Sequence, residues 1–126
     1  MQNLHGARVL LLEDEFLIAL DAEQILKDLG ARHVVIAATL SDAETRARES
    51  RFDVALLDVN INGEMSFGLA ELLRARGVPV VFATGYQLKD SNIAETTTEH
   101  CVTKPYTSDR LRQVLSAAMA SATAQG

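Results

Sequence analysis

Short runs of aliphatic and β-branched residues alternate along this chain with longer stretches in which apolar residues recur every three or four positions. Several short runs are apolar at successive positions, which is typical of parallel strands covered by helices on both faces. The longer stretches have the period of amphipathic helices. The pattern predicts a three-layer α/β domain of five strand–helix units, with strands at 8–12, 33–37, 53–57, 80–83 and 101–103.

The predicted helices begin and end at recognisable signals. Residues 85–99 are the weakest stretch, because Ser91, Asn92 and the run Thr96-Thr97-Thr98 have poor helix propensity, so a fourth helix is predicted to be short, frayed or absent. The first helix is predicted at 15–29 with Gly30 after it, and the second from an N-cap at Ser41 or Asp42 to 49. The third is predicted around Leu69, Leu72 and Leu73, with Gly77 after it. The last is predicted at 108–121, with Thr107 or Ser108 as its cap.

Polar side chains follow four of the predicted strands. Glu13 and Asp14 follow the first, Asp58 the third, Thr84 the fourth and Lys104 the fifth. Parallel strands bring their carboxyl ends to one edge of the sheet, where open α/β folds bind their ligands. We therefore expect three carboxylates, a hydroxyl and an ammonium group to gather there.

This set of groups indicates phosphoryl chemistry. Glu13, Asp14 and Asp58 form an oxygen-rich set suited to Mg²⁺, and without a cation at least one of them should have a raised pKa. Asp58 is the predicted nucleophile, since a carboxylate oxygen can attack phosphorus once a metal screens its charge. The Thr84 hydroxyl and the Lys104 ammonium group would then hold the phosphate oxygens.

Composition limits the surroundings of this site. We expect one domain over 1–126, with a core from about 7 to 121 and a short flexible tail that leaves no room for an output domain. The formal net charge of −5, with 12 Lys and Arg against 17 Asp and Glu, argues against nucleic acid. No signal peptide or membrane span is predicted, and the single cysteine, Cys101, fits a reducing compartment, so a cytoplasmic location is expected.

The order and spacing of these residues resemble the receiver domain of two-component response regulators. The resemblance implies a flavodoxin-like, doubly wound sheet in the order 2-1-3-4-5. It implies Mg²⁺ bound by Asp14, Asp58 and the backbone carbonyl of Asn60, with Glu13 acting through water, and a cis peptide bond before Pro105. A sensor histidine kinase or a histidine phosphotransfer protein is the implied phosphoryl donor, and the domain would catalyse only its own phosphorylation and dephosphorylation. The matched segments are 9–15, 56–60, 83–85 and 103–105.

The run from Pro79 to Tyr86 is similar to the signature of a single-domain receiver subgroup nicknamed FAT GUY. The likeness implies a protein without an output domain, which signals through its own surface or drains phosphate from a phosphorelay. A monomer or weak dimer is expected. Most receivers carry Tyr or Phe three residues before the lysine that is Lys104 here, but this chain has Cys101. Tyr86 is therefore predicted to act with Thr84 as the switch.

The sequence has three alternative interpretations. The domain would act as a phosphorylation-independent interaction module if it had kept only the fold. A phosphatase of the haloacid-dehalogenase type would need a second aspartate two residues after the nucleophile, where this chain has Asn60. A flavodoxin-like cofactor binder would need a glycine-rich phosphate loop after the first strand, where this chain has Glu13 and Asp14.

Overall fold

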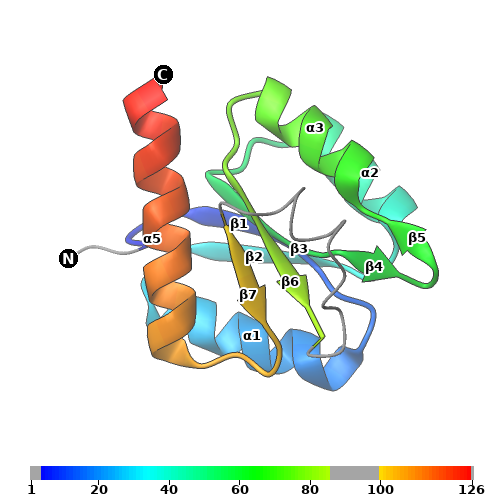
Figure 1. Ribbon diagram of the computed structural model, residues 1–126, viewed down its shortest axis with the longest axis horizontal. Helices are drawn as coiled ribbons and strands as arrows, with labels where there is room; N and C mark the ends of the chain where they lie inside the picture. The colour runs from blue at the N-terminus through cyan, green and yellow to red at the C-terminus, as the bar shows by residue number, and fades with distance from the viewer. Residues whose placement is uncertain (1–3, 86–99, 126) are drawn as a thin grey trace.

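The computed structural model describes residues 4–85 and 100–125 of the chain. A five-stranded parallel sheet forms its centre (Figure 1). Its strands are β1 (Arg8–Leu12), β2 (His33–Ala37), β3 (Val54–Asp58), β6 (Val80–Thr84) and β7 (Cys101–Thr103). They lie in the order β2-β1-β3-β6-β7. Because β6 and β7 are the fourth and fifth strands of this sheet along the chain, the predicted order 2-1-3-4-5 is confirmed.

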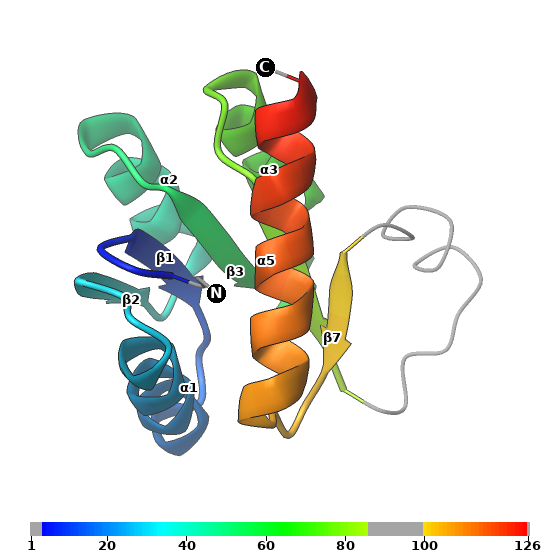
Figure 2. The same cartoon turned by 90° about the vertical axis from the view of Figure 1, so that its left-hand side faces the viewer.

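Helices cover both faces of the sheet. The described helices are α1 (Phe16–Asp28), α2 (Leu40–Glu49), α3 (Phe67–Ala75) and α5 (Ser108–Gln125). Figures 1 and 2 show α1 and α5 on one face and α2 and α3 on the other. Along β1, Val9 and Leu11 pack on the α1–α5 side while Leu10 and Leu12 pack on the α2–α3 side. Burial on both faces explains why the strands are apolar at successive positions.

Two of the predicted helix ends are confirmed. Gly30 follows α1 with a φ of 110°, and a Cβ atom there would lie 3.1 Å from the backbone of His5. Both the conformation and the lack of space therefore require glycine. At the start of α5, the backbone N–H of Arg110 donates to Thr107 Oγ1 at 3.2 Å, so Thr107 is the cap.

Other predicted boundaries are wrong. The N-cap of α2 is Thr39 rather than Ser41 or Asp42, since Thr39 Oγ1 accepts the backbone N–H of Asp42 at 3.0 Å. The last helix runs to Gln125 instead of ending at 121, because the alanine-rich segment has high helix propensity and contains no stop signal. The predicted tail after 121 is therefore helical. The third strand is 54–58 rather than 53–57, so Asp58 is itself the last residue of β3.

The face of α1 that packs on the sheet combines small and large apolar residues. Ala19, Ala22 and Leu26 are its buried residues, and Ile18 and Ile25 are partly buried and pack against the same core. Small residues at the centre of the interface let the helix approach the sheet closely, and the larger aliphatic side chains pack around them.

A two-stranded antiparallel hairpin follows β3 and was not predicted. It consists of β4 (Asn60–Ile61) and β5 (Glu64–Met65). Asn62 and Gly63 form its turn with φ values of 53° and 85°, and the Gly63 N–H donates to Asn60 Oδ1 at 2.9 Å. Asn-Gly is a strong signal for such a turn, so the sequence carried the information.

Two predictions lie outside the described residues: the weak or absent fourth helix within 85–99 and the switch role of Tyr86. Within the described part of the chain, every helix is too short or too polar to cross a bilayer.

Candidate metal and phosphoryl site

The carboxyl ends of the strands bring the predicted site residues to one edge of the sheet. Glu13 and Asp14 directly follow β1, Asp58 and Thr84 end β3 and β6, and Lys104 follows β7. The sheet register pairs Asp58 with Ala83, the neighbour of Thr84, so these two strand ends lie side by side. Lys104 is held beside β6 because its backbone N–H donates to the Thr84 carbonyl at 2.9 Å.

The three carboxylates form one cluster. Oxygen atoms of Glu13, Asp14 and Asp58 lie within 4.8 Å of one another. Glu13 and Asp58 are only 1% and 6% exposed, whereas Asp14 lies open to solvent. A hard cation that keeps part of its water shell fits this combination of buried and exposed oxygens, and Mg²⁺ is such an ion. The predicted cluster is present with suitable chemistry for the ion.

One ammonium group bridges the two buried carboxylates. Lys104 Nζ donates to Glu13 Oε1 and to Asp58 Oδ2, each at 3.1 Å. A second Glu13 oxygen, Oε2, accepts the backbone N–H of Glu15 at 3.1 Å. The lysine therefore supplies one positive charge to a cluster of three carboxylates, which leaves the cluster with an excess of negative charge.

Burial is the largest single influence on the pKa values of Glu13, Asp58 and Lys104. Burial raises the pKa of Glu13 above its ordinary value, although the Glu15 N–H and Lys104 oppose the rise. Burial likewise raises the pKa of Asp58 against the influence of Lys104, and the charge of Asp14 adds to the rise. For Lys104, burial opposes the charged form, but Asp58 and Glu13 outweigh it and raise the pKa. Raised carboxyl pKa values agree with the expectation for the metal-free site.

The loop after β7 adds a group that the sequence did not single out. The Lys104–Pro105 peptide bond is cis, as the resemblance implies. Tyr106 follows and is 7% exposed, and burial together with the charges of Glu13 and Asp58 raises the pKa of its phenol. Tyr106 therefore stays neutral and presents a buried ring close to the acidic cluster.

Ser66 is the second residue that sequence reasoning missed. It is fully buried, and its hydroxyl donates to the backbone carbonyls of Asp58 at 2.7 Å and Val59 at 3.3 Å. Its backbone N–H donates to the Val59 carbonyl at 2.9 Å. Ser66 occupies the N-cap position of α3, but its hydroxyl makes no cap hydrogen bond. A serine before a helix predicts a cap, and that interpretation hides the attachment of Ser66 to the end of β3.

Asn60, two residues after Asp58, uses its side chain in the hairpin turn, where Oδ1 accepts the Gly63 N–H. This side-chain oxygen therefore stabilises the hairpin turn. The metal-binding role of the Asn60 backbone carbonyl stays a prediction.

A five-stranded doubly wound sheet with this acidic cluster and lysine at its carboxyl edge defines a receiver-type α/β domain. The chain belongs to the response regulator receiver domain family, whose family model matches residues 9–116. The predicted family is therefore confirmed, and the FAT GUY subgroup stays a prediction.

Individual relatives agree with this class. The phyllosphere-induced regulator PhyR of Methylorubrum extorquens is 31% identical over 118 residues, which cover 90% of this chain and 44% of PhyR. The solution structure of SdrG from Sphingomonas melonis is 36% identical with a TM-score of 0.76, covering 94% of this chain and 99% of SdrG. The chain spans less than half the length of the curated relatives that it matches.

A more distant structure shares the fold. The receiver domain of sensor histidine kinase PA1611 from Pseudomonas aeruginosa was solved with a magnesium ion coordinated in its active-site cleft. It is 24% identical with a TM-score of 0.77, covering 91% of this chain and 98% of that one, and it shares the fold.

Proposed function

We propose that this chain is a Mg²⁺-dependent phosphoacceptor in two-component signalling, with Asp58 as the phosphorylated residue. The observation that carries the proposal is the Lys104 ammonium group, which lies 3.1 Å from both Asp58 and Glu13 inside a cluster of three carboxylates. Such a cluster has a need for further positive charge, and its lysine is placed to contact a phosphoryl group on Asp58.

In the proposed reaction, an Asp58 carboxylate oxygen attacks the phosphorus atom of a phosphohistidine. A P–O bond forms, the P–N bond breaks, and its electron pair leaves on the imidazole nitrogen. Asp14, Asp58 and the Asn60 carbonyl would hold Mg²⁺, with Glu13 acting through water, and the ion would supply charge that offsets the phosphoryl oxygens. Lys104 and the Thr84 hydroxyl would contact the same oxygens, and hydrolysis by water would restore Asp58.

The donor is proposed to be a sensor histidine kinase or a phosphotransfer protein. A phosphohistidine must enter beside Asp14, and the exposed surface next to it is unusually apolar. Phe16, Leu17 and Leu20 at the start of α1 are 72%, 77% and 41% exposed. Exposed apolar groups of this size are typical of protein contact surfaces, so this part of α1 is the proposed docking surface for the donor.

The finer assignments belong to the same proposal. The chain is proposed to act in the cytoplasm as a single-domain regulator of the FAT GUY type, which signals through its own surface or drains phosphate, and to catalyse only its own phosphorylation and dephosphorylation. The likeness to SdrG, which this chain covers almost end to end, supports a single-domain form. A phosphorylation-independent interaction module is the competing function, while the family match disfavours a dehalogenase-type phosphatase.

Intact mass after incubation with acetyl phosphate and Mg²⁺ tests the proposal. The unaltered chain should gain one phosphoryl group, and the adduct should disappear with a chelator or in Asp58→Asn. Asp109→Asn is the matched control, because this aspartate lies on α5 with its side chain 89% exposed. An unmodified chain under conditions in which Mg²⁺ binding is measured independently would favour the interaction module.

A further inference from the structure

A second candidate site lies at the opposite end of the sheet from Asp58. A cavity of about 650 Å³ opens between the amino ends of β1 and β3 and the carboxyl ends of α2 and α3. Three guanidinium groups line it, those of Arg8, Arg51 and Arg76, against one carboxylate, that of Asp53. This local excess of positive charge stands out in a chain whose formal net charge is −5.

Arg8 carries the observation that points to a ligand. Its Nε atom is buried and has no hydrogen-bond partner, and it is the sole side-chain nitrogen or oxygen atom of that kind in the described part of the chain. Its guanidinium carbon lies 5.5 Å from the centre of the Phe52 ring, which fixes the plane of the group against an apolar wall. An unpaired buried N–H group is costly, and Arg8 lines the cavity, so an acceptor that enters the cavity and reaches this group would be favoured.

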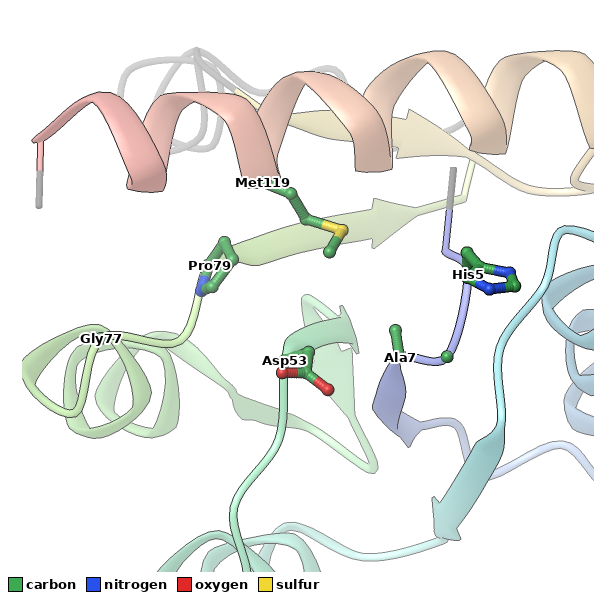
Figure 3. A pocket seen from close by; sticks show the side chains of 7 residues that line it. His5, Ala7, Asp53, Gly77, Pro79 and Met119 are labelled. Carbon is green, nitrogen blue, oxygen red and sulfur yellow. The ribbon is translucent and has the colours of Figure 1, made fainter. Parts of the chain in front are cut away.

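Asp53 does not neutralise these arginines directly. Its Oδ2 atom accepts the backbone N–H of Arg8 at 2.8 Å, and among residues 4–85 and 100–125 no ion pair within 4.0 Å joins it to a guanidinium group. Figure 3 shows Asp53 between Pro79 and Ala7 in a neighbouring cavity of about 470 Å³. Asp53 lines both cavities, and the lining of the second one contains no arginine or lysine.

The other two arginines differ in how much of their donor capacity is used. Arg76 Nη1 donates to the carbonyl of Ala47 near the end of α2 at 3.1 Å. No hydrogen bond or ion pair connects the Arg51 side chain to the rest of the described chain. Arginines near helix carboxyl ends can simply offset the helix dipoles. That explanation suits Arg76, but it leaves Arg8, which starts β1, without a reason for its buried Nε.

We propose that this cavity, the arginine pocket (Arg8, Ser50, Arg51, Phe52 and Arg76), binds a small oxyanion, either a phosphate group or a carboxylate. The planar fork of a guanidinium group matches both anions with paired N–H donors. Arg8 and Arg51 provide those donors, and the Ser50 hydroxyl at the cavity wall adds another. The buried Phe52 ring keeps water from one side, which strengthens charge-assisted hydrogen bonds there.

Arginine side-chain NMR tests the proposal. The ¹⁵Nε–¹Hε signals of the full chain, with a chelator present, are followed during separate titrations with sodium phosphate, sodium benzoate and sodium chloride at matched ionic strength. We expect saturable shifts of the Arg8 and Arg51 signals with at least one oxyanion. Saturation with phosphate alone assigns a phosphate ligand, with benzoate alone a carboxylate on an apolar body, and with both a general oxyanion site.

Variants keep the test decisive. Arg51→Gln changes an exposed side chain and should weaken binding about tenfold, as expected for one lost charge-assisted hydrogen bond. Arg8→Lys keeps the charge without the fork and should weaken it similarly. Arg112→Gln is the control, because Arg112 lies on α5 and pairs with Asp109. Shifts that stay linear and equal to those with chloride, or unchanged binding in both pocket variants, would overturn the proposal.

Discussion

Glu13, Asp58 and Lys104 set the electrostatic character of the site residue by residue. The two buried carboxylates share one ammonium group, at 3.1 Å from each, and both have raised pKa values because burial outweighs that partner. Function and stability therefore oppose one another here. Charges that would serve a metal and a phosphoryl group make the metal-free fold less stable at neutral pH.

Asp58→Asn should stabilise the metal-free chain by about 1 kcal/mol at pH 7.5, because it removes a buried charge while Glu13 remains as the partner of Lys104. A raised carboxyl pKa gives stability that is fully present below the unfolded value, near pH 4, and is lost as pH rises through the folded value. The increase in the free energy of unfolding caused by Asp58→Asn should therefore become smaller toward pH 4. Urea unfolding with a chelator at both pH values checks this, with Asp109→Asn as control, and destabilisation at neutral pH would contradict it.

Ser66→Ala should destabilise the chain by about 1–2 kcal/mol, because the buried carbonyls of Asp58 and Val59 lose their hydroxyl donor. The end of β3 should also be held less firmly, so phosphorylation by acetyl phosphate should slow. Urea unfolding and the rate of adduct formation measure the two effects. Ser41→Ala, at an exposed serine of α2, is the control. Equal results for the two variants would show that Ser66 has no positioning role.

Among the elements, the β4–β5 hairpin and the start of α1 flank the site, and they were predicted with unequal success. The extent of α1 follows from its periodicity and Gly30. The hairpin was missed because two strands of two residues each are too short for a periodic pattern, although Asn62 and Gly63 signal the turn. Similarly, the polar Ser41 and Asp42 hid the true cap, Thr39, since a cap is decided by hydrogen-bond geometry rather than by residue type alone.

Alanine should change the free energy of unfolding in opposite directions at two glycines, Gly63 in the hairpin turn and Gly68 in α3. Gly63 has a φ of 85°, so Gly63→Ala should destabilise the chain by about 1 kcal/mol. Gly68 lies in the first turn of α3, and a Cβ atom there would meet nothing within 4 Å, so Gly68→Ala should stabilise by a few tenths of a kcal/mol. Chemical unfolding of both variants is the measurement. If Gly68→Ala lowered the free energy of unfolding as much as Gly63→Ala, the open helical position assigned to Gly68 would be contradicted.

Over the whole molecule, the gathering of the site followed from the sequence, because parallel strands bring their carboxyl ends to one edge of the sheet. The order of the strands came from the resemblance to receiver domains. Glu13, Asp14, Asp58 and Lys104 meet as predicted. Ser66 and Tyr106 could not be found in this way, because their contacts to the site depend on how a loop folds back and not on a strand end. The arginine pocket was missed for the same reason, since its residues come from three separate segments.

Mg²⁺ should stabilise the folded chain as a whole, because the unfolded chain lacks the assembled cluster. The raised pKa values of Glu13 and Asp58 mean that protons compete with the ion at low pH. The rise in Tm on adding Mg²⁺ should therefore be larger at pH 8 than at pH 5.5, and it should be strongly reduced in Asp58→Asn. Thermal unfolding with Mg²⁺ and with a chelator measures this difference in Tm. If the rise in Tm were the same at both pH values and in Asp58→Asn, Mg²⁺ would bind outside the carboxylate cluster.

Locating the phosphoryl group tests the assignment of Asp58 as the phosphoacceptor most directly. After reaction with acetyl phosphate and Mg²⁺, borohydride reduces an aspartyl phosphate to homoserine, and peptide mass spectrometry identifies the converted position. We expect homoserine at position 58 alone, with none when Mg²⁺ is removed. Conversion at Asp14 or at an aspartate outside the cluster would contradict the assignment of Asp58 as the phosphoacceptor, as would a chain that gains no phosphoryl group while it binds Mg²⁺.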